Sequence, residues 1–454
     1  MNYDLIVLGG GPAGYLAAER AGEAGLQVLV IEKEYIGGVC LNVGCIPTKT
    51  LLNSAKIYDK AHQGEAYGVL AEDISLDHKK VLSRKKKVVN TLVSGVESSL
   101  KQAGVDVLNA TGQLVGRENG TVKVAAEGQE YTAENLLIAT GSSPIKPGIP
   151  GLDEAFENDF VLTSKQLLDV QEVPQSLIIV GGGFIGLEMG SYFNSAGSEV
   201  TVIEMLDHIG GQLERDISEN LLARYQDKGI NFQLNSRVTE FKGNEVIYEV
   251  DGKQQSQKAD KVLLSIGRKP VVSGFGLENI GVDHEDGYIK VDETGQTNIP
   301  GVYAAGDVNG QSLLAHTAYR EAEVCVNNIL GQKDNMRYEA IPMVIYTNPE
   351  VASVGLTARE AEEQGIDYQE EEISMMYSGR YVAENKDKSG ICKIIVEQKY
   401  QKLIGVHLIG NYTSEIIYGA GMMIENEMRV EDIKEVVFPH PTVSEVLREG
   451  IFKF

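Results

Sequence analysis

The chain carries the same glycine pattern twice, and each copy stands between an apolar run and a helical pattern. The first copy is residues 9–14 (GGGPAG) and the second is residues 181–186 (GGGFIG). After each helical pattern a second apolar run ends on an acid, Glu32 in the first copy and Glu204 in the second. The order of strand, glycine turn, helix, strand and acid is typical of the unit that binds a dinucleotide.

Each glycine of the pattern has its own task. Gly9 allows the tight turn, Gly11 lets the backbone approach a pyrophosphate, and Gly14 lets the helix lie close to the strand. The matching glycines of the second copy are Gly181, Gly183 and Gly186. Glu32 and Glu204 are placed to accept hydrogen bonds from ribose hydroxyls, so the chain is expected to bind two dinucleotides.

The two copies lie too far apart in the sequence to be the halves of one sheet, which predicts two complete binding domains. A strand-like segment at residues 301–307 is expected to return to the first domain, and the pattern changes to α+β from about residue 338. The predicted fold class is therefore α/β, with two Rossmann-like dinucleotide-binding domains and a C-terminal α+β domain. The expected domains are residues 1–146 with 271–337, residues 147–270, and residues 338–454.

Two cysteines, Cys40 and Cys45, stand at the start of a predicted helix that is expected to begin near Pro47. Their spacing allows a small disulfide ring, and a thiolate is favoured at a helix N-terminus. Two buried free thiols or half of a metal site are the alternatives. A zinc site would need a second pair of ligands, whereas Cys325 and Cys392 stand alone. The pattern favours a redox pair, and no metal site is predicted.

Charge and hydropathy exclude several other classes. The formal net charge of the 454 residues is −24, which argues against binding to nucleic acid or to an anionic membrane. The basic run at residues 84–87 falls in a helical pattern and is expected to be a solvated helix face. No apolar stretch is long enough to span a membrane, and the N-terminus enters a strand without a signal peptide. We expect a cytoplasmic protein.

Over essentially its whole length the chain resembles the pyridine nucleotide–disulfide oxidoreductases, most closely those members that oxidise dihydrolipoamide. The resemblance rests on both glycine patterns and on residues 37–49 (GGVCLNVGCIPTK), 304–307 (AAGD) and 440–445 (HPTVSE). It implies FAD in the first domain, a nicotinamide nucleotide in the second, and a homodimer formed by the third.

The resemblance also implies roles for the reactive residues. Cys40 would be the interchange thiol that reacts with substrate, and Cys45 would lie against the flavin as a charge-transfer thiolate. His440 would reach across from the partner subunit as general base, oriented by Glu445. These residue types suit the chemistry, because thiol–disulfide exchange needs a thiolate and a proton acceptor that works near neutral pH.

Further site residues follow from the same resemblance. Lys49 would lie near N5 of the flavin and pair with Glu188. The other positions that match FAD contacts are Gly9, Gly11, Gly14, Glu32, Gly112, Thr140, Gly141, Ser142, Asp307 and Ala315. The positions that match contacts with the nicotinamide nucleotide are Gly181, Gly183, Gly186, Glu204, Val238 and Gly267.

The choice of NAD rests on Glu204, because a carboxylate there repels a 2′-phosphate and no arginine occurs in residues 204–208. The last cysteine of the sequence is Cys392, so the redox pair near the C-terminus that marks mercuric reductases is not expected. The resemblance thus implies an NAD-dependent enzyme that reoxidises dihydrolipoamide on a lipoylated carrier of a 2-oxo acid dehydrogenase or glycine cleavage system. Two alternatives remain: an NADH-dependent reductase of another small disulfide, or a non-catalytic FAD-binding interaction subunit.

Overall fold

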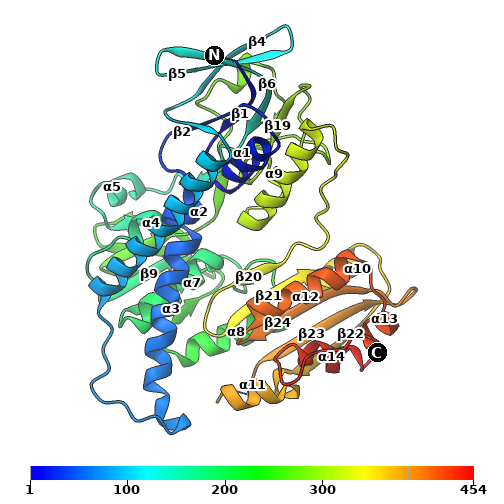
Figure 1. The fold of residues 1–454 in the computed structure, drawn as a ribbon. Helices are drawn as coiled ribbons and strands as arrows, with labels where there is room; N and C mark the ends of the chain where they lie inside the picture. The colour runs from blue at the N-terminus through cyan, green and yellow to red at the C-terminus, as the bar shows by residue number, and fades with distance from the viewer. Residues whose placement is uncertain (1, 387) are drawn as a thin grey trace. The chain divides into compact units, whose positions relative to one another are not determined.

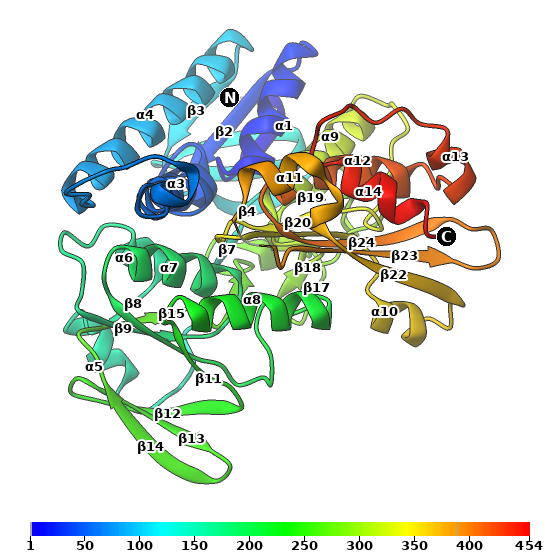
Figure 2. The same ribbon diagram turned by 90° about the horizontal axis from the view of Figure 1, so that it is seen from below.

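The computed structural model describes residues 2–386 and 388–454, which form two compact units. Unit 1 comprises the chain up to Thr50 together with Leu82–Lys146 and Gly267–Arg337. Unit 2 comprises Leu51–Val81, Pro147–Ile266 and Tyr338–Phe454. Figures 1 and 2 show their helices and strands.

Unit 1 is built on a mixed sheet in the order β3-β2-β1-β6-β5-β4, with β19 paired to β6. Strands β3, β2, β1, β6 and β19 run parallel to their neighbours among these five. Strand β5 pairs antiparallel with β6, and β4 pairs antiparallel with β5. Its strands are β1 (Asn2–Leu8), β2 (Val28–Glu32), β3 (Asp106–Asn109), β4 (Gln113–Glu118), β5 (Thr121–Ala126), β6 (Gln129–Ile138) and β19 (Val302–Ala304). The segment at residues 301–307 therefore returns to the sheet that contains β1.

Strand β1 is buried on both faces, as the continuous apolar run predicts for a parallel strand. Leu5 and Val7 face one hydrophobic cluster, and Ile6 and Leu8 face another, because successive side chains of a strand point to opposite faces. The first cluster is completed by helices α1 (Pro12–Glu23) and α9 (Ala315–Ile329), which pack together in Figure 1.

The cysteine segment forms two helices, α2 (Gly38–Val43) and α3 (Cys45–His62). Helix α3 begins earlier than expected, at Cys45, and Thr48 N–H already donates to the carbonyl of Gly44. Pro47 is tolerated there because the first N–H groups of a helix have no partner within it. Helix α4 (His78–Gln102) carries the basic run, which is exposed except for the buried Lys85.

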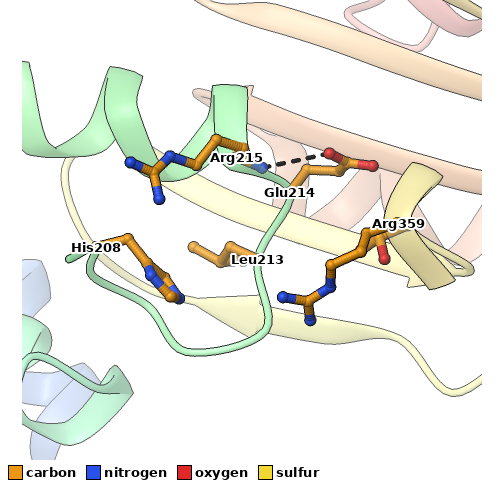
Figure 3. Close-up of a pocket in the computed structure, with 6 residues that line it drawn as sticks. His208, Leu213, Glu214, Arg215 and Arg359 are labelled. Atoms are coloured by element: carbon orange, nitrogen blue, oxygen red, sulfur yellow. Dashed lines mark hydrogen bonds between the residues drawn. The ribbon is translucent and has the colours of Figure 1, made fainter. Parts of the chain in front are cut away.

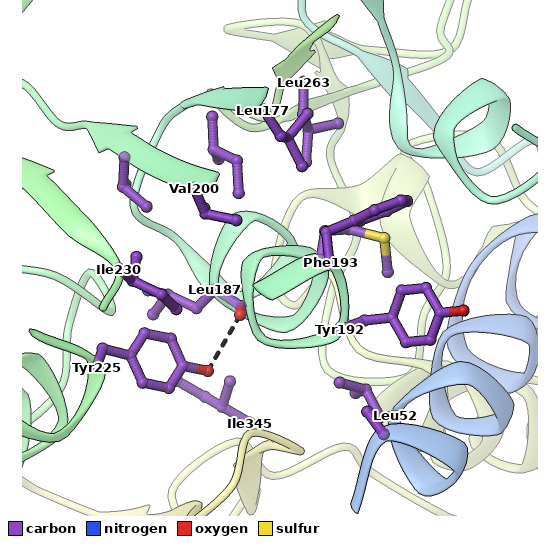
Figure 4. Packing of buried hydrophobic residues seen from close by; sticks show 14 of the residues in the cluster. Leu52, Leu177, Leu187, Tyr192, Phe193, Val200, Tyr225, Ile230, Leu263 and Ile345 are labelled. Carbon is purple, nitrogen blue, oxygen red and sulfur yellow. Dashed lines mark hydrogen bonds between the residues drawn. The ribbon is translucent and has the colours of Figure 1, made fainter. Parts of the chain in front are cut away.

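In unit 2 a parallel sheet has the order β11-β10-β9-β15-β8. Its strands are β8 (Val161–Leu162), β9 (Ser176–Val180), β10 (Glu199–Ile203), β11 (Asn231–Gln233) and β15 (Lys261–Leu264). Helices α7 (Phe184–Ser195) and α8 (Arg215–Asp227) follow β9 and β10. In Figure 4 the side chains of α7 lie among those of strand residues Leu177, Val200 and Leu263, and Tyr225 donates a hydrogen bond to the carbonyl of Leu187.

Between β11 and β15 the chain forms a separate antiparallel sheet of three strands, β12 (Ser236–Lys242), β13 (Glu245–Val250) and β14 (Lys253–Lys258). Beyond residue 338 the pattern becomes α+β, as predicted, with an antiparallel sheet in the order β20-β21-β24-β23-β22. Its strands are β20 (Met343–Ile345), β21 (Glu350–Gly355), β22 (Tyr368–Ser374), β23 (Ile391–Glu397) and β24 (Leu403–Gly410). The helices of this part are α10 (Ala358–Glu363), α11 (Gly379–Glu384), α12 (Thr413–Glu425), α13 (Val430–Lys434) and α14 (Glu445–Ile451).

Across residues 2–386 and 388–454, no helix combines the length and the apolar character that a membrane span requires.

An ion cluster around the buried Lys393 and Glu214 joins separate segments of unit 2. Lys393 Nζ on β23 lies 3.4 Å from Glu214, 2.9 Å from Asp216 and 3.1 Å from Glu370, and only 7% of the Lys393 side chain is exposed. Glu214, itself 6% exposed, also caps α8 and accepts a hydrogen bond from Ala358 N–H. Burial lowers the pKa of Lys393, but the bonds to its carboxylate partners outweigh burial and hold that pKa above its ordinary value.

We expect Lys393→Met to destabilise the protein by about 3 to 5 kcal/mol, because it leaves the Glu214 carboxylate buried without its cation. Thermal and urea unfolding measure the loss, and adding Glu214→Gln should restore part of it by removing the stranded charge. Lys253→Met, on the exposed strand β14, is the matched control and should leave stability unchanged. A Lys393→Met protein as stable as the control would contradict the assignment.

Candidate functional site

The first glycine turn joins β1 to α1, and the protein itself requires glycine at two of its positions. Gly9 has φ +105°, and a Cβ added there would lie 2.2 Å from the carbonyl oxygen of Ala139. A Cβ added at Gly14 would lie 1.8 Å from the carbonyl oxygen of Gly9. Helix α1 can therefore sit this close to the strand only while position 14 has no side chain.

Gly11 is different, because nothing in the protein excludes a side chain there. Its backbone (φ −75°, ψ −172°) suits any residue, and the nearest atom to an added Cβ is the Cα of Gly38 at 3.9 Å. Gly11 is the N-cap of α1 and offers no side-chain cap, so the first N–H groups of the helix remain available. An open cradle at a helix N-terminus fits the pyrophosphate of a dinucleotide.

The second glycine turn, between β9 and α7, likewise has two positions that require glycine and one that does not. A Cβ at Gly181 (φ +104°) would lie 2.6 Å from the carbonyl oxygen of Ser265, and one at Gly186 would lie 2.2 Å from that of Gly181. Gly183 has φ −80°, and a Cβ there would meet nothing within 4 Å. Both turns thus leave the same position open toward a ligand.

Each turn is held to the acid that ends the next strand. Glu32 accepts hydrogen bonds from the backbone N–H groups of Gly10 and Glu34, both at 2.6 Å. Glu204 accepts from Gly182 N–H at 2.5 Å and from Leu206 N–H at 2.9 Å. A carboxylate oxygen can accept more than one hydrogen bond, so both acids keep capacity for ribose hydroxyls.

The remaining positions predicted to contact FAD lie in unit 1. A Cβ at Gly112 would meet Leu8 at 2.8 Å and Ile31 at 3.2 Å, which places this glycine beside the carboxyl ends of β1 and β2. Ser142 donates a hydrogen bond to Asp307. Thr140 donates to the carbonyl of Val271, Gly141 accepts from Val271 N–H, and Ala315 is the first residue of α9.

Sequence reasoning missed two charged residues of this region. Arg268 donates to the hydroxyl and carbonyl of Ser142 at 2.8 and 2.7 Å and lies 4.0 Å from Asp307. Burial lowers the pKa of Arg268, and the charges of Asp307 and Cys45 oppose that shift. The buried Glu321 accepts from Gly306 N–H at 2.6 Å. The only signal in the sequence for Arg268 was its place directly after a predicted strand end.

Two residues predicted to contact the nicotinamide nucleotide, Val238 and Gly267, lie outside the second glycine turn. Val238 lies on β12, where its side chain is packed in a hydrophobic cluster of unit 2. Gly267 (φ +118°) belongs to unit 1, and its carbonyl accepts from Ile145 N–H. Their roles stay predictions.

The cysteines occupy unlike positions, Cys40 inside the short helix α2 and Cys45 at the first position of α3. Both are thiols in this structure, and Cys40 donates a hydrogen bond to Cys45. This bond raises the pKa of the Cys40 thiol above its usual range, burial raises it further, and the Lys49 ammonium opposes both. Cys45 is the first residue of α3, and the N-terminus of a helix favours a thiolate.

His440 and Glu445 are in contact in unit 2, as the resemblance to the family implies. His440 Nδ1 lies 2.7 Å from Glu445 Oε1, and Glu445 Oε2 accepts from Thr442 N–H at 2.9 Å. The hydrogen bond from His440 is the largest cause that lowers the pKa of Glu445. The His440 side chain is 77% exposed, so its Nε2 edge is open to another molecule.

The other predicted pair is Lys49 and Glu188. Lys49 lies on α3 one turn after Cys45, and Glu188 lies on α7. Glu188 is buried and accepts a hydrogen bond from Tyr346 N–H at 2.9 Å. The pairing of Lys49 with Glu188 stays a prediction.

A cavity of about 250 Å³ lies in unit 2 at the start of α8, lined by His208, Leu213, Glu214, Arg215, Thr357 and Arg359 (Figure 3). Its basic side chains already have partners. His208 and Arg215 both contact Asp207, Arg215 also contacts Glu219, and Arg359 lies 3.7 Å from Glu363. In the described residues, no group of His, Cys, Asp and Glu is arranged to hold a metal ion.

The sequence pattern of the family described as pyridine nucleotide-disulphide oxidoreductase matches residues 3–322, and that of its dimerisation domain matches residues 341–451. The chain belongs to this family. It is 39% identical to the dihydrolipoyl dehydrogenase of Mycoplasma pneumoniae, with 99% of this chain and 98% of the relative aligned. It is 36% identical to the dihydrolipoyl dehydrogenase of Geobacillus stearothermophilus, covering 98% and 95% of the two chains.

Solved structures of similar fold cover nearly the whole chain. LpdA from Mycobacterium tuberculosis superposes with a TM-score of 0.90 at 26% identity, covering 99% of both chains. The HOCl-induced flavoprotein disulfide reductase RclA from Escherichia coli gives a TM-score of 0.85 at 27% identity, again over 99% of both chains. The predicted fold class, with its C-terminal dimerisation domain, is confirmed. Members of the family use FAD and NAD(H), so the cofactor prediction is confirmed at the level of the family.

We expect Gly11→Ala to fold and yet bind FAD weakly, because the new methyl group fills the cradle without touching the protein. The ratio of flavin to protein absorbance of the purified variant, and its recovery on adding FAD, measure the effect. A loss of tenfold or more in FAD affinity corresponds to about 1.4 kcal/mol of displaced pyrophosphate contact.

Gly14→Ala is the matched comparison. Its methyl group would collide with the carbonyl of Gly9, so this variant should lose folded protein as well as flavin. If Gly11→Ala retained FAD as tightly as the unaltered protein, the cradle would not be the pyrophosphate site.

We expect Glu204→Gln to raise the KM for NAD about tenfold while flavin content stays normal, because the ribose loses a charge-assisted hydrogen bond. The preference for NAD over NADP should fall at the same time, since a 2′-phosphate no longer meets a carboxylate. Steady-state kinetics with both nucleotides measure this change. Glu199→Gln, at the opposite end of β10, should change neither constant; an unaltered preference in Glu204→Gln would refute the selector role.

Proposed function

We propose that this chain is an NAD-dependent dihydrolipoyl dehydrogenase that reoxidises dihydrolipoamide through Cys40 and Cys45. The observation that carries the proposal is the unequal cysteine pair, with Cys45 at the N-terminus of α3 and Cys40 donating to it. Relatives of nearly the same length that are named dihydrolipoyl dehydrogenase support the choice of substrate.

The exchange begins with the two cysteines joined as a disulfide. A substrate thiolate attacks the sulfur of Cys40, a substrate–Cys40 disulfide forms, and the Cys40–Cys45 bond breaks to release the Cys45 thiolate. The second substrate thiolate then attacks the substrate sulfur of that mixed disulfide, which closes the substrate ring and releases Cys40. The substrate loses two electrons and two protons, and the protein dithiol gains the electron pair.

Proton transfer in these steps needs a base near the substrate thiols. His440 suits this task because Glu445 fixes its Nδ1 and leaves Nε2 open. The exposure of His440 agrees with a base that serves the partner subunit of a homodimer, as the resemblance implies. The turn at Gly11 would hold FAD, and the turn at Gly183 would hold NAD⁺. When bound, these cofactors would supply the acceptors for the electron pair of the dithiol.

The proposal also covers which residues form each domain, where the protein is located and which carrier brings the substrate. FAD would be bound by residues 1–146 and 271–337, NAD by residues 147–270, and the partner subunit by residues 338–454. The substrate would be the lipoyl group of a 2-oxo acid dehydrogenase or glycine cleavage carrier, in the cytoplasm. The presence of Cys40, Cys45, Lys49, Glu188, His440 and Glu445 disfavours a non-catalytic subunit.

We expect Cys40→Ser to lower dihydrolipoamide turnover by a factor on the order of a thousand or more, because serine cannot form the mixed disulfide. NADH formation from dihydrolipoamide and NAD⁺ measures this loss. The variant should stay yellow and still oxidise NADH with a quinone acceptor, since those steps bypass Cys40. Cys325→Ala, which removes a buried lone thiol, should keep full turnover.

Two outcomes would contradict the proposal. Retained turnover in Cys40→Ser would remove Cys40 from its role. Rapid NADH-dependent reduction of another disulfide by the unaltered protein, such as glutathione disulfide, with no turnover of lipoamide, would favour the alternative function.

A further inference from the structure

A largely buried arginine of unit 1 joins two residues that the resemblance assigns to the FAD site. Arg268 begins β16 (Arg268–Pro270), which pairs antiparallel with β7 (Ser142–Pro144). Its Nε donates to the hydroxyl oxygen of Ser142 at 2.8 Å, and its Nη2 donates to the carbonyl oxygen of the same residue at 2.7 Å. The Nε also lies 4.0 Å from Oδ2 of Asp307, and only 15% of the Arg268 side chain is exposed.

These contacts fix the direction of the hydrogen bonds among the three side chains. A guanidinium can only donate, so the Ser142 hydroxyl must accept from Arg268. A serine hydroxyl has one proton, and Ser142 donates it to Oδ2 of Asp307. Arg268 therefore acts on the Asp307 carboxylate in two ways, through its charge and through the serine hydroxyl.

The Asp307 carboxylate has one oxygen engaged and one available. A buried positive charge is costly unless a negative group pairs with it, and Asp307 meets that need of Arg268. Among the described residues, the contacts of the Asp307 side chain with Ser142 and Arg268 both reach Oδ2, and 26% of this side chain is exposed. Oδ1 therefore keeps its capacity to accept a hydrogen bond from a ligand hydroxyl.

The backbone at Asp307 is held by a different residue. Gly306 N–H donates to the buried carboxylate of Glu321 on α9 at 2.6 Å. Gly306 has φ +79°, a conformation that favours glycine and starts the turn into η3 (Asp307–Asn309). These restraints act on the main chain without Arg268, so what Arg268 adds is the orientation of the Asp307 side chain.

We propose that Arg268 is a positioning residue of the FAD site, which holds the carboxylate of Asp307, directly and through Ser142, in the orientation that receives FAD. The proposal rests on the proposed function only in taking Asp307 to contact FAD. Loss of Arg268 would leave the Asp307 backbone in place and release its carboxylate to turn. A brace that only joins β16 to β7 is the competing interpretation.

The test is a double-mutant cycle on FAD affinity with Arg268→Met and Asp307→Asn. A dilution series of the holoenzyme, in which the fluorescence of released FAD is followed, gives the dissociation constant. Each single variant should raise this constant about tenfold, because each weakens a charge-assisted hydrogen bond to the cofactor. The double variant should bind FAD no more weakly than Asp307→Asn, since Arg268 acts through that carboxylate.

Two further variants complete the design. Arg117 on β4 also joins distant segments of unit 1, by donating to the carbonyl of Pro300 at 2.8 Å, so Arg117→Met is the matched control and should leave FAD affinity unchanged. Arg268→Lys keeps the charge but loses the paired donors, and should weaken FAD binding less than Arg268→Met. The same cycle is run with Arg268→Lys if Arg268→Met does not fold.

A brace gives a different result, because its effect does not depend on Asp307. If the losses of Arg268→Met and Asp307→Asn multiply in the double variant, the inference fails. It also fails if the Arg268 variants bind FAD as tightly as Arg117→Met, or if Asp307→Asn leaves FAD affinity unaltered. The measurement uses neither dihydrolipoamide nor NAD, so its outcome would stand even if lipoamide turnover were absent.

Discussion

The close approach of Gly14 to the carbonyl of Gly9 is the constraint on which unit 1 depends. It fixes α1 against β1 and so fixes where the N-terminus of that helix points. Helix α2 then packs on this N-terminus through Gly38 and Gly11, two residues without side chains. The dinucleotide cradle and the reactive cysteines are therefore positioned by one helix start. A change that moves α1 would disturb cofactor binding and thiol chemistry together.

The glycine turn of unit 2 depends on a similar close approach between a glycine and a backbone carbonyl. The carbonyl of Ser265 on the neighbouring strand excludes a side chain at Gly181, and Glu204 holds the turn through Gly182 N–H. The loop after Glu204 is fastened in turn by Gly210 N–H to the carbonyl of Gly182, and it ends at Glu214 in the ion cluster of Lys393. Glu204 is thus connected, through this loop, to the sheet that carries Lys393.

Local patterns in the sequence were sufficient for the strands and the glycine turns, because each depends on neighbours a few residues away. The contact of His440 with Glu445 was expected only from the resemblance to the family. They also predicted the helix at the cysteines, although its start at Cys45 required the tolerance of Pro47 in a first turn. Arg268, Glu321 and Tyr319 could not be found this way, because their importance comes from partners far away in the chain. Arg268 meets Ser142 where residues 268–270 pair with residues 142–144, and Tyr319 meets Tyr15 where α9 packs on α1. Lys85, expected to belong to a solvated face, is buried.

The difference between the two cysteines follows from backbone placement rather than from their own chemistry. Cys45 begins a helix of 18 residues, whose unpaired N–H groups favour negative charge, while Cys40 lies within a helix of six residues and donates to Cys45. Such a placement favours negative charge on Cys45 and makes Cys40 the weaker leaving group when substrate departs.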